Sequence, residues 1–293
     1  MTVKPVHRNR KKNGSATRVP LALALAGTLT VVCLAVAEAG ETSPKRETAK
    51  SRTARAAADL LNVNYQDGSL NSGIPELTTT HATAKDASYT LPSGDDHAVA
   101  HKVTLGDPAY ESDGAPRSES AANKVPEGVF HVGDMRRYEF SVLLKDWESF
   151  DPGDPVGGDI LFQGKHAGGN FPSFFLAAKR NAIVFRSPKL QFQDAIVEDF
   201  TPYINKWMTF RVDVRWTDDA TGFYKISSKL PGESGFTLRK THENVQTFHP
   251  ENPTEFGYIK WGLYRPDQSI EGGFVPTRVV HHDNIRVTDL ATE

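Results

Sequence analysis

The segment TFRVDVRW, residues 209–216, alternates apolar and polar side chains along its whole length. Its phenylalanine, valines and tryptophan fall on one face of an extended chain, and its polar side chains fall on the other. This period of two is typical of a β-strand with one buried face. The turn sequence Asp218–Gly222 follows, and Phe223–Ile226 then supplies a returning strand. The stretch therefore predicts a β-hairpin whose apolar face packs against a second layer.

Short apolar segments separated by turn residues fill the chain from Leu60 onward. Turn signals such as Asp67-Gly68, Asp113-Gly114 and Pro231-Gly232 recur between them. The further strand candidates are Ala98–Thr104, Arg137–Leu144, Asp159–Gln163, Ala182–Arg186, Tyr258–Tyr264 and Asn284–Thr288. This spacing predicts an all-β fold, a β-jelly roll sandwich of two antiparallel sheets. We expect one face to form a concave cleft that can hold an extended substrate.

Residues 1–39 are typical of a signal peptide. Six Lys and Arg residues precede an uncharged apolar run, Val19–Ala37, and the small residues at its end offer A-x-A cleavage sites. An uncleaved N-terminal anchor is the alternative, because the run is just long enough to cross a membrane. We expect a secreted protein, or else a membrane-anchored one that faces the outside. A polar spacer over residues 40–59 and one jelly-roll domain over residues 60–293 complete the predicted organisation.

The cysteine content and the net charge exclude some kinds of chemistry and some kinds of binding partner. Cys33 is the only cysteine and lies in the predicted signal, so we expect no disulfide or thiol chemistry in the mature chain. Cleavage after Ala39 leaves 28 Lys and Arg against 35 Asp and Glu, a net charge of −7. Nucleic-acid binders are normally basic, so we exclude a nucleic-acid partner. An acidic surface also repels an anionic ligand, which would therefore need a local basic cleft.

A strand-like segment near the C-terminus, GYIKWGLYR at residues 257–265, combines a core face with an unusual polar face. Tyr258, Lys260 and Tyr264 share the polar face, and the isoleucine, tryptophan and leucine share the other. Gly262 lies on the polar face and leaves room for a sugar ring to approach the backbone. Lys and Tyr are also ordinary on an exposed outer strand, so this segment alone does not establish a binding surface.

Two other segments carry residues of the same chemical kind, RSE at residues 117–119 and ILFQGKH at 160–166. The order RSE, FQ-x-x-H and YIKWGLYR resembles that of the jelly-roll polysaccharide lyases, nearest the heparin lyase I and glucuronan lyase group. Alginate lyases carry related motifs more distantly. The resemblance runs from Leu60 to Thr288. It implies an enzyme that cleaves an acidic, uronate-containing polysaccharide by β-elimination and leaves an unsaturated uronate end, with glucuronan slightly ahead of alginate or heparin.

β-Elimination at a uronate needs three kinds of group. Hydrogen-bond donors must neutralise the carboxylate, and we assign this role to Arg117, Gln163 and Lys260. A base must remove the C5 proton and an acid must protonate the leaving oxygen, and we assign His166 and Tyr264 to these roles.

Four more residues are expected to contact the substrate: Glu119, Lys165, Tyr258 and Arg265. Glu119 has two other interpretations, since it could form a surface ion pair with Arg117 or orient that side chain from behind.

One departure from the alginate-lyase pattern bears on the base. Two residues separate Gln163 from His166, so in a regular strand their side chains point to opposite faces. Either Gly164 forms a bulge that restores the common face, or Lys165 takes the cleft position. His101 and His131 are the other histidines considered as the base.

Rival functions and cofactors complete the predictions. A glycoside hydrolase needs two positioned carboxylates, and the E-x-D-x-x-E strand signature is missing from the sequence. A non-catalytic, lectin-like jelly-roll module that binds the same glycan is the main alternative. We expect a monomer with no required cofactor. A structural Ca²⁺ at the acidic loop Asp146–Asp159 is a secondary option, although the loop lacks EF-hand spacing.

Overall fold

The computed structural model describes residues 57–93, 96–154, 156–169, 171–249, 255–266 and 276–290. The predicted signal peptide lies outside these residues, as does most of the predicted spacer. The described chain starts a strand at Ala58, two residues before the predicted domain boundary. No helix among the described residues is long and apolar enough to cross a membrane.

Two antiparallel eight-stranded sheets form the fold, and we name them after a central strand. The β8 sheet has the order β11-β10-β9-β8-β15-β5-β4, with β6 paired to β15. Its strands are β4 (Glu111–Ser112), β5 (Ala115–Ala121), β6 (Val129–Phe130), β8 (Asp159–His166), β9 (Phe174–Lys179), β10 (Ala182–Ser187), β11 (Phe192–Val197) and β15 (Gly257–Tyr264).

The second sheet, the β7 sheet, has the order β14-β13-β12-β7-β16-β3-β2, with β1 paired to β16. Its strands are β1 (Ala58–Val63), β2 (Ser88–Ser93), β3 (Asp96–Thr104), β7 (Met135–Lys145), β12 (Met208–Arg215), β13 (Gly222–Lys229), β14 (Thr237–Val245) and β16 (Thr277–Asp289). Three short 3₁₀ turns connect strands, at Pro108–Tyr110, Pro126–Gly128 and Thr201–Tyr203.

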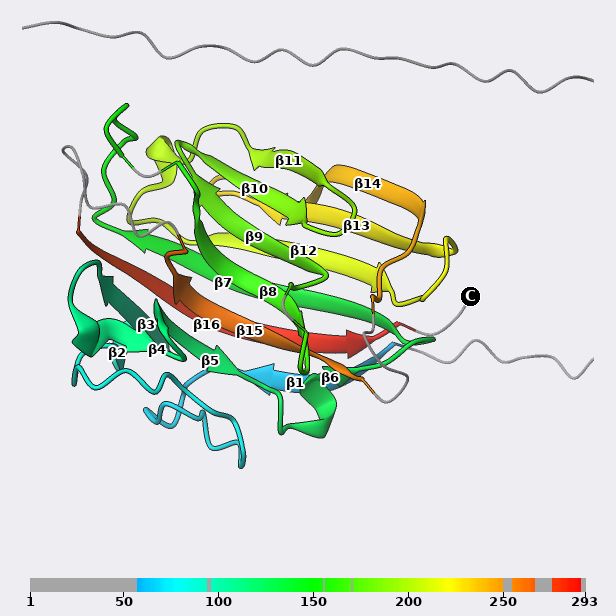
Figure 1. Cartoon of the computed structure of the whole chain (residues 1–293), viewed down its shortest axis with the longest axis horizontal. Helices are drawn as coiled ribbons and strands as arrows, with labels where there is room; N and C mark the ends of the chain where they lie inside the picture. Colours follow the sequence, from blue (N-terminus) through cyan, green and yellow to red (C-terminus); the bar gives the residue numbers. More distant parts are fainter. Residues whose placement is uncertain are drawn as a thin grey trace, which may run out of the picture. The chain divides into compact units, whose positions relative to one another are not determined.

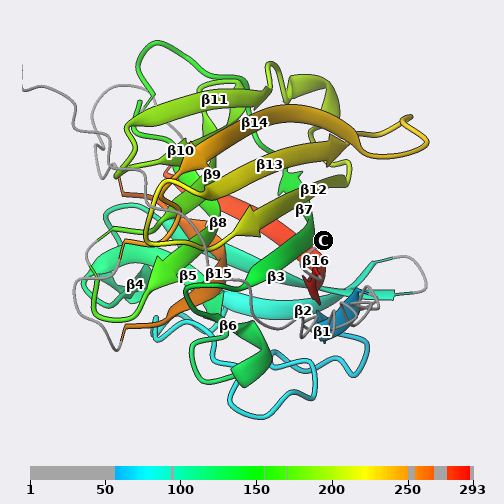
Figure 2. The same cartoon turned by 90° about the vertical axis from the view of Figure 1, so that its right-hand side faces the viewer.

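The two sheets stack face to face, as Figures 1 and 2 show, with the β8 sheet on the left in Figure 2. One large hydrophobic cluster fills the space between them, with aromatic side chains from both layers. Phe140 of the β7 sheet and Phe162 of the β8 sheet stack with ring centroids 3.9 Å apart. Burial of such rings is the main favourable contribution to the stability of a sandwich.

The predicted jelly-roll sandwich is confirmed. Strand β12 has the strict alternation of burial that residues 209–216 predict, and β13 pairs with it as the returning strand of the hairpin. Because the inner face of each sheet is committed to the core, the functional side chains are to be sought on the outer faces.

Candidate active site

Strand β15 presents the predicted polar face on the outside of the β8 sheet. Tyr258, Lys260 and Tyr264 are half-buried there, whereas the isoleucine, tryptophan and leucine between them belong to the core. Gly262 has a φ of 144°, and a Cβ at this position would collide with the carbonyl oxygen of Ser118 on β5. The glycine is therefore required by the close approach of β5, which is a different reason from the room for a sugar ring that the sequence suggested.

A single buried carboxylate, that of Glu119, holds the predicted uronate-binding donors together. Its Oε1 accepts a hydrogen bond from Gln163 Nε2 at 2.6 Å, and its Oε2 accepts one from Lys260 Nζ at 2.6 Å. The Arg117 guanidinium lies 3.9 Å from Oε2. The Glu119 side chain is only 4% exposed, so two cations and an amide compensate a charge that would be costly to bury alone. Four predicted residues from three strands thus converge on one point.

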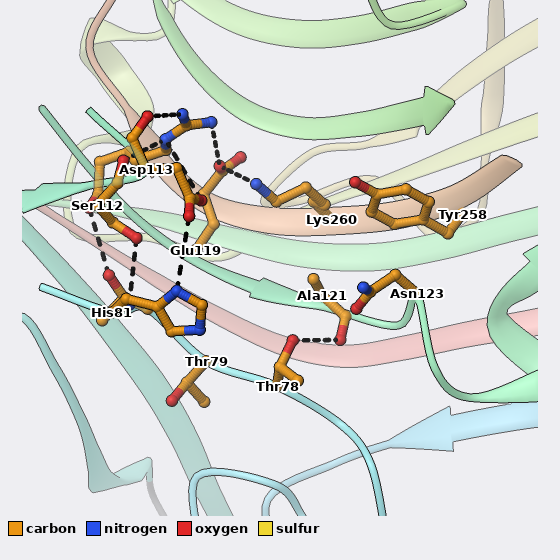
Figure 3. Close-up of a pocket in the computed structure, with 12 residues that line it drawn as sticks. Thr78, Thr79, His81, Ser112, Asp113, Glu119, Ala121, Asn123, Tyr258 and Lys260 are labelled. Atoms are coloured by element: carbon orange, nitrogen blue, oxygen red, sulfur yellow. Dashed lines mark hydrogen bonds and ion pairs between the residues drawn. The ribbon is translucent and has the colours of Figure 1, made fainter. Parts of the chain in front are cut away.

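A cavity of about 180 Å³ opens on the outer face beside this cluster. Its floor comes from β5 and β15, including Glu119 and Lys260, and Tyr258 stands next to Lys260 at one end (Figure 3). The lining residues are Thr78, Thr79, Thr80, His81, Ser112, Asp113, Arg117, Glu119, Ala121, Asn123, Tyr258 and Lys260.

The wall of the cavity is an irregular segment, residues 78–82, that runs along β5. Thr78 exchanges backbone hydrogen bonds with Ala121 at 2.9 and 3.1 Å, and the His81 backbone N–H donates to Ser112 Oγ at 3.1 Å. The His81 imidazole points toward Asp113, with Nδ1 3.5 Å from the carboxylate (Figure 3). The ring is 75% exposed, so its other nitrogen is accessible to a bound molecule.

His81 is the functional candidate that the sequence did not reveal. It follows three threonines in a stretch without a strand or motif pattern. Long-range hydrogen bonds, including the pairing of Thr78 with Ala121, bring it to the cavity. The local sequence pattern at His81 is a histidine after a run of β-branched residues. This pattern is too common to identify a functional residue.

Two phenols flank Lys260 on β15. Burial raises the pKa of Tyr258, and the nearby Glu119 and Asp113 carboxylates raise it further, so this phenol stays protonated. Tyr264 lies opposite Arg117, whose guanidinium is 5.0 Å from the centre of the ring. Tyr258 lines the cavity, whereas Tyr264 lies outside the lining, next to Arg117. Each phenol can donate a hydrogen bond to a sugar oxygen that reaches it.

The prediction that His166 lies in the cleft is wrong. The pairing of β8 with β15 is regular from Gln163 to His166, so no bulge restores a common face. His166 points into the core, where its Nε2 lies 2.5 Å from Ser173 Oγ and its ring stacks on Phe248. Burial lowers its pKa to about 4. Lys165 takes the outer position instead, as the second alternative proposed.

The two other histidines considered as the base do not line the cavity either. His101 is completely buried between the sheets, where Nδ1 lies 3.0 Å from Ser118 Oγ, and burial lowers its pKa to about 3. His131 is exposed, and its ring lies 6.5 Å from that of Phe256.

Arg265 is a structural residue rather than a substrate contact. It follows Tyr264 in the strand direction and so points to the opposite side, where it is 1% exposed and pairs with Asp159 at 3.4 Å. Arg278 joins the same carboxylate at 2.7 Å and also binds Glu148. This correction follows from the alternation of side chains in an extended chain.

The acidic loop proposed for calcium does not fit a metal site. Asp159 and Glu148 are occupied by arginines, as described above. Among the residues that the structure covers, no group of three or more His, Cys, Asp or Glu side chains is placed to hold a metal ion.

Comparison with known proteins decides the family. The family model described as "Polysaccharide lyase" matches residues 64–286, which is most of the chain. The chain belongs to this polysaccharide lyase family. A comparison with curated protein sequences gave no match.

Solved structures of other lyases share the fold of this polysaccharide lyase. The endo-β-1,4-glucuronan lyase of the fungus Trichoderma reesei is 17% identical, with a TM-score of 0.52 over 82% of this chain and 98% of that one. The alginate lyase of Aplysia kurodai is 11% identical, with a TM-score of 0.50 over 81% and 99%. The alginate lyase of Klebsiella pneumoniae is 12% identical, with a TM-score of 0.50 over 68% and 84%. Family membership makes the lyase an enzyme, so the lectin-like alternative is not retained.

Proposed function

We propose that this lyase cleaves a uronate-containing polysaccharide by β-elimination at the cavity on the outer face of the β8 sheet. The observation that carries the proposal is the convergence of Arg117, Lys260 and Gln163 on the Glu119 carboxylate. Arg117, Lys260 and Glu119 line the same cavity as the His81 imidazole. A carboxylate bound by these donors would have its charge compensated, and this stabilises the carbanion-like transition state.

The proposed reaction removes one proton from C5 and delivers one proton to the leaving oxygen. His81 takes the C5 proton, while the Asp113 carboxylate orients its ring. The electron pair forms the C4–C5 double bond and expels the oxygen at C4, which takes a proton from Tyr264. Tyr264 carries this role because the Arg117 guanidinium, which would hold the carboxylate, lies against its ring. Tyr258 would bind the substrate.

Glucuronan is the substrate we favour, with alginate and heparin-type chains next. The T. reesei lyase of the same fold acts on glucuronan, and the motif order resembles that group. Export through the N-terminal segment remains our prediction, and it would give the enzyme access to polymers outside the cell.

The first experiment incubates the protein with glucuronan, alginate, heparin and a neutral glucan and follows the ultraviolet absorbance of an unsaturated uronate. We expect absorbance to rise with at least one acidic polymer and not with the neutral one. His81→Asn and Tyr264→Phe should each lower kcat by about 10²- to 10⁴-fold, the usual contribution of an acid or base. His166→Asn is the matched control, because its ring faces the core.

Three outcomes would contradict parts of this proposal. No absorbance change with any acidic polymer would reject uronate elimination. Full activity in His81→Asn would reject His81 as the base. Full activity in Tyr264→Phe, with loss in Tyr258→Phe, would transfer the acid role to Tyr258.

A further inference from the structure

A continuous row of side chains leads away from the cavity across the outer face of the β8 sheet. Backbone pairing sets Lys260 opposite Gln163, Gln163 opposite Phe175, and Phe175 opposite Arg186. Directly opposed residues in antiparallel strands point to the same face. Arg186 on β10 therefore lies three strands away from Lys260 on β15, a span of about 14 Å at the usual strand spacing.

A second cavity lies at the far end of this row. It has a volume of about 450 Å³ and is lined by Lys179, Arg186, Pro188, Gln191, Phe192 and Gln193. Two of these residues are cations, two are amides and none is a carboxylate. Lys179 Nζ donates to Gln193 Oε1 at 3.2 Å, which leaves the amide nitrogen free to donate to a ligand. Such a set of donors suits an anionic, hydroxyl-rich ligand.

Arg186 differs from three arginines of the β7 sheet, which are engaged by carboxylates. Arg137, Arg211 and Arg278 are each bound to a carboxylate at 2.7 or 2.8 Å. Arg186 is exposed and lies 5.9 Å from the Phe175 ring centre, and it has no ion pair with a carboxylate in the described part of the chain. An unpaired guanidinium over an aromatic ring is available for a carboxylate from outside.

Apolar side chains connect the two cavities along the neighbouring row. Ile160, Ala177 and Val184 lie side by side on β8, β9 and β10 and form a small cluster with Phe175 and Tyr264. Ile160, Ala177 and Val184 are themselves buried, so the half-buried rings of Phe175 and Tyr264 are the part of this cluster that can contact the apolar faces of sugar rings. The polar groups at both ends would bind the carboxylates. The outer face therefore carries cationic groups at two points with an apolar strip between them.

We propose that the Arg186 cavity is a distal subsite that binds a second uronate carboxylate of the same polymer chain. This inference rests on the proposed function, and it adds that the substrate is a chain with repeated charges, held over more than one sugar ring. Arg186 is a specificity-determining residue and takes no part in the bond cleavage. The subsite also offers local positive charge on a protein that is otherwise acidic, which favours capture of long anionic chains.

The test compares Arg186→Ala with Arg215→Ala, which removes another exposed strand arginine, from the β7 sheet. On glucuronan, KM should rise about tenfold in Arg186→Ala, the loss expected for one charge-assisted contact, with kcat unchanged. KM on the shortest oligomer that is cleaved should not change. Arg186→Lys should recover part of the affinity, and Arg215→Ala should behave as the wild type. An unchanged KM on glucuronan in Arg186→Ala would overturn the subsite and leave the lyase proposal intact.

Affinity electrophoresis in gels that contain glucuronan separates failure of the subsite from failure of the proposed chemistry. If the wild type releases no unsaturated product, the proposed function fails, but retardation in the gel still reports binding. Retardation of the wild type and Arg215→Ala, with reduced retardation of Arg186→Ala, supports the subsite. Equal migration of all three proteins overturns it.

Discussion

Glu119 shows how one buried charge can organise a site that binds charge. Its carboxylate accepts hydrogen bonds from Lys260 and Gln163 and lies near Arg117, so it fixes the directions of three side chains. The same carboxylate competes with the substrate for these donors. In the proposed mechanism Glu119 is a positioning residue, and the arriving uronate must share its donors or replace it.

Removal of Glu119 should cost stability as well as activity. We expect Glu119→Ala to lower the free energy of unfolding by about 3 kcal/mol, because the buried Lys260 ammonium loses its partner. The double variant Glu119→Ala/Lys260→Met should be more stable than the single variant, since it removes the orphaned charge, yet it should remain inactive. Urea unfolding and the absorbance assay measure the two effects. Equal stability of the single and double variants would show that the pair is not coupled.

At the scale of the strands, the pairing of β5 with β15 depends on Gly262. Gly262→Ala places a Cβ against the β5 backbone at a φ of 144°, and neither the contact nor the angle can be relieved cheaply. We expect a loss of about 2 kcal/mol or more in unfolding free energy and a fall in kcat, because the strands that hold Glu119 and Lys260 separate.

Gly235→Ala is the control for this substitution, since a Cβ there meets nothing within 4 Å. It should leave both thermal stability and activity near those of the wild type. Wild-type stability of Gly262→Ala would contradict this prediction, because it would show that β5 can shift to accommodate the added Cβ.

The strands, and the side chains of β15 that point outward, were predictable because extended chains alternate strictly. Residues 209–216 predict a strand, and β12 spans Met208–Arg215. The same rule set His166 on the core face unless a bulge intervened. Applied to Arg265 it gives the side opposite to Tyr264, so the substrate contact predicted for Arg265 neglected it. His81 could not be predicted, because its position depends on a long-range bridge between Thr78 and Ala121 and on no local pattern. The ring of donors around Glu119 likewise needed the strand order, which the sequence alone does not specify.

Buried histidines make the stability of the whole molecule depend on pH. Burial lowers the pKa of His101 to about 3 and of His166 to about 4, and it lowers that of His282 well below its usual value. Burial raises the pKa of Asp283 to about 7, which has the opposite effect. Between pH 6.5 and pH 4 the unfolded chain therefore binds protons at these three histidines that the folded chain excludes, while the folded chain binds one at Asp283. Burial also lowers the pKa of His249 and His281, which acts in the same direction as the three histidines.

The expected result is a loss of stability as the pH falls. The net uptake of about two protons on unfolding corresponds to about 3 kcal/mol per pH unit near pH 5. Tm measured at pH 7, 6 and 5 should decrease steadily, and His166→Asn should show a shallower dependence because one of the three histidines is removed. A Tm that is constant over this range would contradict the assignment of these buried histidines as neutral.

The way the cavity wall is attached has a consequence for how such enzymes can diverge. The side chains proposed to bind the sugar acid lie on three paired strands. The proposed base lies instead on the short segment 78–82, which a few hydrogen bonds attach to Ala121, Arg117 and Ser112. Substitutions in segment 78–82 can therefore move, replace or remove the proton acceptor without disturbing the side chains on the three strands. Binding of the polymer and the chemistry of its cleavage can then change independently of each other within one fold.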